Sequence, residues 1–216
     1  MAALRLEPAR SLLCLGAHAD DIEIGCGATL LGWLEATPSL EVTWVVFSAA
    51  GVRRDEAAAS AAAYLQNHPS SRVKILDFQD AYFPAHWKAI KDTFGQLARE
   101  VRPDLVFTHR LEDRHQDHRV VAELTWNAFR DTTILEYEVP KYEGDLGQPN
   151  LYQPVQARHA ERKLDLLPRC FPTQAEKDWF DRETFAGLLR LRGLESRSPS
   201  RLAEAFYARK LGLAMA

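Results

Sequence analysis

Two short segments of this 216-residue sequence gather side chains that bind metal ions and transfer protons. One is His-Ala-Asp-Asp at positions 18–21, and the other is Arg-His-Gln-Asp-His at positions 114–118. Two imidazoles and one carboxylate are a common zinc environment, in which a fourth position stays open for water. Because zinc lowers the pKa of such a water to about 7, the two segments predict a site for metal-assisted hydrolysis of an amide or ester.

Within these segments we assign His18, Asp21 and His118 as the metal ligands, since the first two lie in one tight turn and can face the same ion. Asp20, beside a ligand, is placed to act as the general base that takes a proton from water. His115, one helical turn before His118, is placed to donate a hydrogen bond or a proton to the oxyanion or to the departing amine. Taken singly, Asp20 and Asp21 also fit helix caps. Their combination with the second segment favours catalysis.

Three further residues are predicted to support the ligands or to contact the substrate. Asp117 is placed to fix the tautomer of a ligand histidine, although it also fits a helix cap. Arg53 can bind a substrate hydroxyl or phosphate, pair with Glu56 on the same helix, or do both. Glu23 either supports the ligands or is a carboxylate favoured near a helix N-terminus.

Polar residues near the two segments receive a structural interpretation. His109, Glu112 and Asp113 follow a predicted strand and could line the pocket, but a position on the surface of the loop is favoured. Cys26 lies between two glycines and is interpreted as a small buried packing residue.

The elements that must position these residues alternate between strand and helix patterns. The apolar run at 12–15 predicts a buried strand that ends at Gly16, and a helix is expected at 28–36. Further strands are predicted at 40–47, 73–77, 105–108 and 133–139, and further helices at 55–66, 87–100 and 117–129. This alternation predicts an α/β fold with a mainly parallel sheet flanked by helices. Ligands bind at the carboxyl ends of such strands, where both polar segments begin.

The character of the sequence changes beyond Pro140. Residues 142–154 are rich in Gly, Pro and Tyr and predict a long loop over the active-site edge. Helices are expected at 157–167 and 177–191, and a last helix or strand-plus-helix at 201–211. We therefore expect a single domain over 1–216, with a core at about 10–140 and a C-terminal extension of loops and helices at about 141–216.

The composition bounds the class of protein. A hydrophobic share of 46% and a charged share of 26% are ordinary for a soluble globular chain. The net charge of −3 gives no broad basic surface, so no nucleic-acid partner is expected. Three cysteines, at no zinc-ribbon spacing, predict free thiols in a reducing compartment. Without a signal-peptide pattern or a bilayer-spanning stretch, we expect a cytoplasmic protein with no membrane insertion. Exposed aromatic side chains are compatible with a homo-oligomer.

The two segments also resemble the motifs of a known family. Residues 18–27, HADDIEIGCG, look like the first motif of the PIG-L/LmbE-like N-acetylglucosamine deacetylases, and RHQDH at 114–118 looks like the second. Arg53-x-x-Glu56 with its alanine-rich helix, and AEAF at 203–206, also fit this family. Ala19 stands where the family usually has a proline, which would stiffen the turn.

The resemblance implies a Rossmann-like metal-dependent fold, with zinc as the usual metal. It implies removal of an acetyl group from an N-acetylglucosamine-type sugar or sugar conjugate by attack of zinc-bound water. It gives His18, Asp21 and His118 the ligand roles, Asp20 the role of base, and His115 the acid or oxyanion role. Fe²⁺ or another divalent cation can replace zinc at such a site.

Three alternatives stay open. One is an amidase that acts on another small N-acyl substrate. A second is a Rossmann-type nucleotide-binding enzyme, although Gly16, Gly25 and Gly27 lack the spacing of a dinucleotide-binding turn. The third is a binding module that keeps the fold without the chemistry, but the sequence retains every predicted ligand and the predicted base.

Overall fold

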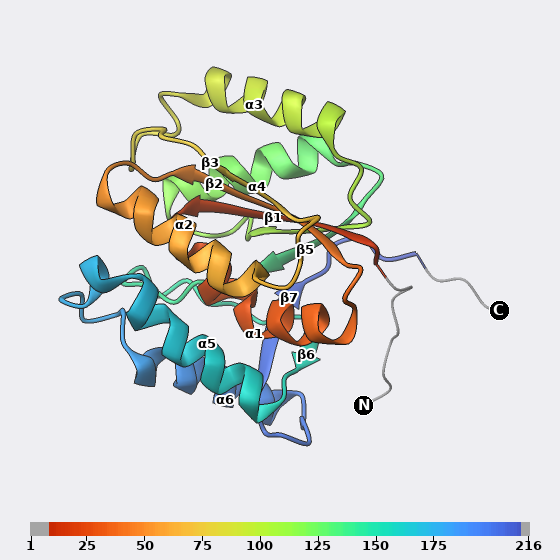
Figure 1. Cartoon of the computed structure of the whole chain (residues 1–216), viewed down its shortest axis with the longest axis vertical. Helices are drawn as coiled ribbons and strands as arrows, with labels where there is room; N and C mark the ends of the chain where they lie inside the picture. The colour runs from red at the N-terminus through yellow and green to blue at the C-terminus, as the bar shows by residue number, and fades with distance from the viewer. Residues whose placement is uncertain (1–8, 213–216) are drawn as a thin grey trace.

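The computed structural model describes residues 9–212, which fold around a seven-stranded sheet (Figure 1). The strands are β1 (Ser11–His18), β2 (Glu41–Ser48), β3 (Arg72–Ile75), β4 (Leu105–His109), β5 (Thr133–Tyr137), β6 (Leu151–Pro154) and β7 (Ala203–Tyr207). Their spatial order is β3-β2-β1-β4-β5-β7-β6, so that β3 and β6 form the two edges. Strands β1 to β5 are parallel, whereas β7 is antiparallel to both β5 and β6. The predicted α/β fold with a mainly parallel sheet is confirmed.

Helices cover both faces of this sheet. They are α1 (Asp21–Ala36), α2 (Val52–Leu65), α3 (Trp87–Glu100), α4 (Gln116–Ala128), α5 (Ala157–Cys170) and α6 (Arg182–Glu195). Helices α3 and α4 lie on one face and α1 and α2 on the other (Figure 1). Helix α5 packs against α1 and α2, and α6 packs against α5 and β7. The sheet therefore separates two apolar cores.

Strand β1, which lies between β2 and β4 inside the sheet, faces both cores. Leu13 and Leu15 belong to the core that contains side chains of α3 and α4, and Leu12 and Cys14 belong to the opposite core. All four side chains are at most 1% exposed. A parallel strand covered on both faces is apolar at nearly every position. The apolar run thus places the end of β1, where His18 lies, in the middle of the sheet.

Strand β1 is longer than predicted, because Gly16 does not end it. Gly16 pairs with Val46 of β2, and the strand continues to His18. A Cβ added at Gly16 would lie 3.0 Å from the Ile22 side chain and 3.2 Å from the His18 carbonyl oxygen. The glycine therefore allows the chain to fold tightly back over the strand rather than interrupting it.

Helix α1 begins at Asp21, seven residues before the predicted start. The low helix propensity of Gly25 and Gly27 concealed its first two turns. In the fold, both glycines are sites of close approach: an added Cβ would lie 2.2 Å from the Tyr137 ring at Gly25 and 2.6 Å from the Tyr64 hydroxyl at Gly27. Close packing against these two tyrosines explains why α1 contains glycines, although glycine has a low helix propensity.

The C-terminal region contributes strands as well as the predicted loop and helices. The end of the predicted loop is strand β6, and the segment expected to end in a helix is only strand β7. The helix expected at 177–191 begins at Arg182, because the Asp181 side chain accepts hydrogen bonds from the amides of Glu183 and Thr184. The last two strands thus complete the sheet that the first five begin.

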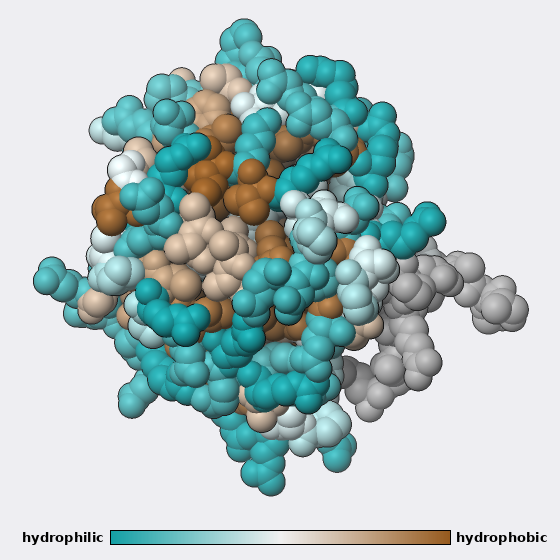
Figure 2. Space-filling view, viewed as in Figure 1, coloured by the Kyte–Doolittle hydropathy of each residue, from teal (hydrophilic) through white to brown (hydrophobic). Residues whose placement is uncertain are grey.

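The cysteines, the alanine-rich helix α2 and the length of the helices can each be compared with what the sequence predicts. Cys14, Cys26 and Cys170 are free and buried, as predicted. The outer side of α2 is rich in exposed alanines and forms a pale brown, weakly hydrophobic surface on the face in Figure 2. Among residues 9–212, no helix combines the length and the apolar character that crossing a membrane requires.

Candidate functional site

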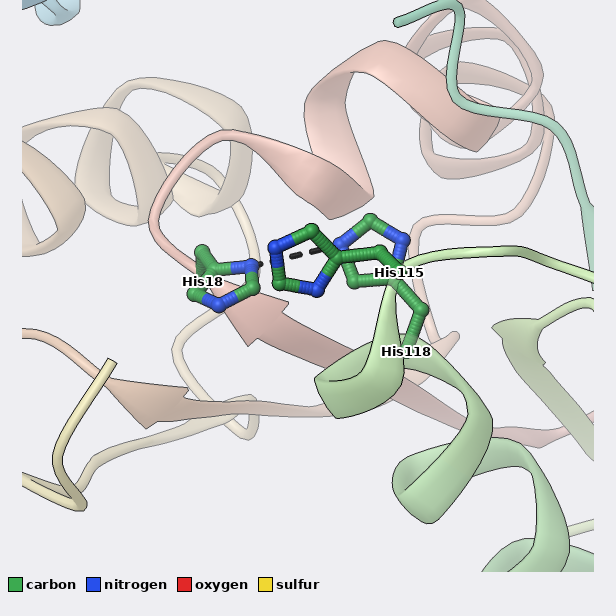
Figure 3. A group of neighbouring side chains, drawn as sticks. All are labelled: His18, His115 and His118. Atoms are coloured by element: carbon green, nitrogen blue, oxygen red, sulfur yellow. Dashed lines mark hydrogen bonds between the residues drawn. The ribbon is translucent and has the colours of Figure 1, made fainter. Parts of the chain in front are cut away.

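The two polar segments meet at the carboxyl ends of neighbouring strands. His18 is the last residue of β1, and Asp20 and Asp21 are the N-cap and first residue of α1. His115 is the N-cap of α4, and His118 lies in its first turn. Because β1 and β4 pair in parallel, α1 and α4 begin at the same edge of the sheet. Figure 3 shows His18, at the end of β1, facing the two imidazoles from the start of α4.

The three predicted metal ligands lie within direct contact of one another. His18 Nδ1 is 3.2 Å from His118 Nε2 and 3.4 Å from Asp21 Oδ2, and His118 Nε2 is 3.4 Å from Asp21 Oδ1. Two ligand atoms bound to one tetrahedral zinc at 2.0–2.1 Å lie about 3.3 Å apart. The donor types suit zinc and each pairwise distance is close to this value, with the two imidazoles facing different oxygens of Asp21. The ligand role of each residue stays a prediction.

The predicted ligands belong to several groups of side chains that could hold an ion, together with His115 or His109. The donor atoms of His18, His115 and His118 lie within 4.8 Å of one another, as do those of Asp21, His109 and His118. The His115 ring centroid is 4.9 Å from that of His18 and 4.6 Å from that of His118. His115 thus lies against two of the three predicted ligands, and its catalytic role stays a prediction.

Asp20 is buried and has an unusual backbone conformation. Its φ of 101° lies in a region that L-residues rarely adopt, and its side chain accepts a hydrogen bond of 2.9 Å from Arg53 Nη2 at Oδ2. Burial and the negative charge of Asp21 raise the pKa of Asp20 to about 7, against the opposing effect of Arg53. A carboxyl group whose pKa lies near neutrality is suited to accept and return a proton.

Arg53 connects the turn at Asp20 to α2 and to the C-terminal region. It donates to the Ala19 carbonyl and to Glu56 Oε2, the second bond at 2.7 Å. Glu56 in turn accepts hydrogen bonds from the amide and the hydroxyl of Thr173. The predicted pairing of Arg53 with Glu56 is confirmed, and Arg53 also holds the carboxylate of the predicted base.

Asp113 contacts one of the predicted ligands, so the favoured surface position is wrong and the pocket-lining alternative holds for this residue. Its Oδ2 lies 3.0 Å from His118 Nδ1 and 2.8 Å from Lys141 Nζ, and the residue is only 4% exposed. Despite burial, the hydrogen bond from His118 and the charge of Lys141 hold the pKa of Asp113 well below its usual range. A carboxylate on Nδ1 fixes the tautomer that leaves Nε2 free for a metal. In the sequence, the only indication of this role was that Asp113 lies in the loop just before the segment that contains His118.

His109 was also assigned to the surface, and this too is wrong. Strand β4 extends one residue further than predicted, so the side chain is fully buried. Its Nε2 accepts from the Ala17 amide at 2.9 Å and lies 3.2 Å from Asp21 Oδ2. Its ring stacks on His118 with centroids 3.9 Å apart, and burial lowers the pKa of His118 to about 3. Glu112, by contrast, is a half-exposed surface residue that pairs with Arg209.

Two acidic groups lie at the other nitrogen of His18. Asp117 Oδ2 is 3.1 Å from His18 Nε2, and the same carboxylate accepts from the amides of Ala81 and Phe83. Asp117 therefore contacts a predicted ligand, as expected, and also anchors the loop after β3. Asp80 Oδ1 is likewise 3.1 Å from His18 Nε2, with its side chain 74% exposed. Sequence reasoning missed Asp80, whose only signal was a carboxylate at the same edge of the sheet.

Glu23 makes its side-chain hydrogen bond to α2 and none to the predicted ligands among the described residues. Its Oε1 accepts a hydrogen bond from the Ser60 hydroxyl of α2, and Oε2 has no hydrogen-bond partner among the described residues. Burial raises the pKa of Glu23 to about 8, although the hydrogen bond from Ser60 opposes this. Glu23 therefore lies in the first turn of α1, as one of its two interpretations requires. The other interpretation, in which it supports the ligands, has no hydrogen bond behind it in the part of the chain that the structure describes.

Comparison with known proteins gives one family match. The model of the family PIG-L, described as GlcNAc-PI de-N-acetylase, matches residues 13–129, just over half of the chain and both polar segments. The chain is also 28% identical over 174 residues to the uncharacterized deacetylase YaiS of Escherichia coli strain K12. That alignment covers 74% of this chain and 90% of YaiS.

Solved structures share the fold. The N,N'-diacetylchitobiose deacetylase of Pyrococcus horikoshii is 22% identical with a TM-score of 0.68, covering 92% of this chain and 83% of its own. GalB, the 4-carboxy-2-hydroxymuconate hydratase of Pseudomonas putida KT2440, is 18% identical with a TM-score of 0.75, covering 96% and 99%. A deacetylase and a hydratase share this architecture, so the fold alone leaves the reaction undetermined.

Proposed function

The chain belongs to the PIG-L family, described as GlcNAc-PI de-N-acetylase, and on this premise we propose that it is a zinc-dependent N-deacetylase. The proposed reaction removes the acetyl group of an N-acetylglucosamine-type sugar or sugar conjugate. The observation that carries the proposal is the approach of His18, Asp21 and His118 to within 3.2–3.4 Å of one another, next to Asp20. Membership in a deacetylase family favours this reaction over nucleotide binding.

The proposed metal would be held by His18, Asp21 and His118. When bound, a divalent cation polarises an amide carbonyl and makes water acidic near neutral pH. Two imidazoles and a carboxylate suit zinc, and they also accept Fe²⁺. Asp113 and Asp117 would keep His118 and His18 in the ligating tautomers and orientations.

Asp20 would act as the proton carrier of the reaction. Arg53 holds Oδ2, which leaves Oδ1 to accept a proton from water as the water oxygen bonds to the acetyl carbon. The same carboxyl group would return the proton to the amine nitrogen as the carbon–nitrogen bond breaks. Acetate and a free amine are then the products, and the carboxylate is regenerated.

His115 would stabilise the oxyanion by hydrogen bonding. Its Nδ1 accepts from the Asp117 amide at 3.3 Å, so the proton of the neutral ring is on Nε2. Burial lowers the pKa of His115, which favours this neutral form. A neutral imidazole that donates from Nε2 fits the oxyanion role predicted from the sequence.

The direct test is an acetate-release screen of the purified protein with and without a chelator. The panel contains N-acetylglucosamine, N,N'-diacetylchitobiose, an N-acetylglucosaminyl lipid and several small N-acyl amines that are not sugars. We expect acetate only from sugar substrates, and only without chelator. Release solely from non-sugar amides would establish the amidase alternative, and chelator-resistant release would refute the metal-dependent mechanism.

A further inference from the structure

A buried ion pair contacts the backbone of α1 one turn beyond its start. Lys163 of α5 and Glu204 of β7 are each 3% exposed at the side chain, with Nζ and Oε1 2.7 Å apart. Lys163 Nζ also donates to the Ile24 carbonyl at 2.6 Å. Glu204 accepts from the amide of Ala28 at 3.0 Å and from that of Thr29 at 2.7 Å. The pair therefore contacts α1 through its main chain.

These contacts involve groups that a helix normally pairs internally. In a regular α-helix the Ala28 amide donates to the Ile24 carbonyl, four residues earlier. Here a cation faces that carbonyl and an anion faces that amide. Hydrogen bonds to charged groups are shorter and stronger than neutral ones. The ion pair therefore fixes the position of α1 at this level more firmly than side-chain packing alone.

Ile24, whose carbonyl Lys163 contacts, is linked to the predicted base Asp20 by one backbone hydrogen bond. The Ile24 amide donates to the Asp20 carbonyl at 2.9 Å, which is the first hydrogen bond of α1. Asp20 has a φ of 101°, a conformation that persists only when its surroundings enforce it. A continuous series of contacts thus runs from Glu204 through Lys163 and Ile24 to Asp20.

Stability alone is a weak reason for such a pair. Replacing a buried ion pair by well-packed apolar side chains is often neutral or stabilising, because two charges no longer have to leave water. Lys163 and Glu204, however, hydrogen-bond to the backbone of α1 close to the active-site turn. Apolar side chains could not make these hydrogen bonds and so could not hold the backbone in the same way.

We propose that Lys163 and Glu204 are positioning residues, which hold the first turn of α1 so that Asp20 and Asp21 face the substrate and the metal. This inference rests on the function proposed above. Neither residue reaches the reacting atoms. Their effect is transmitted through the Ile24 backbone and is therefore expected in metal affinity and in kcat rather than in KM.

The test compares two double variants. Lys163→Met/Glu204→Met removes the pair, and Arg192→Met/Glu138→Met removes a matched control pair. The control pair is equally buried, with Arg192 Nη2 2.6 Å from Glu138 Oε1. Its other hydrogen bonds go to Glu195, Gly147 and Tyr207. For each protein, Zn²⁺ affinity is measured by calorimetric titration of the metal-free form, and acetate release gives kcat and KM.

We expect the first double variant to lose about 10- to 100-fold in Zn²⁺ affinity or in kcat, as supporting residues of metal sites commonly do, with KM little changed. Lys163→Arg, which keeps a donor for the Ile24 carbonyl, should recover part of the loss. The control pair should change neither quantity by more than about 2-fold. Glu204→Gln, which preserves the side-chain shape, gives the same comparison if the methionine variant does not fold.

Two results would overturn the inference. One is wild-type Zn²⁺ affinity and kcat in the folded variants of Lys163 and Glu204. The other is an equal loss in the control pair, which would assign the effect to general packing. A wild-type protein that releases no acetate from any substrate would refute the proposed function instead, and the affinity series would still decide whether the pair positions Asp21.

Discussion

At the scale of the residue, the site is defined by which oxygen or nitrogen atom each partner occupies. Arg53 holds one oxygen of Asp20, and Asp113 holds the nitrogen of His118 that faces away from the predicted metal. His115 accepts the Asp117 amide on Nδ1, which leaves Nε2 as its donor. Asp20, His118 and His115 therefore each have one polar atom held by a hydrogen bond. The other polar atom, Oδ1 of Asp20 or Nε2 of each histidine, has the role proposed in the reaction.

Asp20→Asn is expected to reduce kcat by about 10²- to 10⁴-fold, because the amide cannot take a proton from water. Metal content should not change, since Asp20 is not a predicted ligand. Acetate release and elemental analysis of the same preparation measure both quantities. Full activity in the asparagine variant would show that another group is the base.

Asp113→Asn is expected to weaken metal binding by about 10- to 100-fold, because His118 loses the carboxylate that fixes its tautomer. The neighbouring Glu112→Gln is the control, since Glu112 is half-exposed and pairs with Arg209 away from the predicted ligands. Calorimetric titration with Zn²⁺ compares the two variants. Equal affinities would remove Asp113 from the support of the site.

Residue types and spacing were sufficient to find the residues of the two segments but not all their partners. The proximity of His18, Asp21 and His118 could be predicted because each segment follows a recognisable strand. Asp113 and Asp80 could not, because they lie in loops where no periodicity indicates which way a side chain points. The burial of His109 was not predicted because β4 is one residue longer than the predicted strand and includes it.

At the scale of the element, helix α1 is shaped by its neighbours rather than by its own propensities. Gly25 packs directly on the Tyr137 ring, whereas Gly187 of α6 has no atom within 4 Å of an added Cβ among the residues described. The two helical glycines therefore separate the effects of packing and of helix propensity.

Gly25→Ala is expected to lower the free energy of unfolding by about 1–3 kcal/mol, because the new methyl group overlaps the Tyr137 ring. Gly187→Ala should instead raise it by up to about 1 kcal/mol, the usual gain in helix propensity. Denaturant titrations of both variants measure the difference. A stabilising Gly25→Ala would mean that α1 and Tyr137 are less closely packed than described.

Elements could be predicted where the local pattern determines them. Helix α3 spans residues 87–100, as its strong amphipathic period predicts. Strands β6 and β7 were not predicted as a pair, because their antiparallel pairing joins segments about 50 residues apart. Such contacts leave no mark in a local window of sequence.

At the scale of the whole molecule, the C-terminal region belongs to the same sheet and the same interior as the first 140 residues. Strand β7 pairs with β5, and Glu204 contacts the backbone of α1. A chain ending at residue 140 would lack both. We predict that this fragment does not fold alone, to be measured by near-ultraviolet circular dichroism and proteolysis. A cooperative, protease-resistant fragment would contradict the single-domain interpretation.

Metal removal should affect the molecule as a unit. A ligand that binds only the folded state stabilises it, so a chelator is expected to abolish acetate release and to lower Tm, with little change in helical content. Added Zn²⁺ should restore both quantities. Unchanged activity and Tm after complete metal removal would contradict a metal-dependent enzyme.

The two edges of the sheet also limit how copies of this chain can assemble. Strands β3 and β6 each have only four residues, and β3 carries Arg72 and Lys74 while β6 ends at Pro154, which has no amide hydrogen to donate. Short, charged or proline-ended borders resist the addition of a foreign strand. Polymerisation by continuing the sheet from one copy into the next is therefore disfavoured.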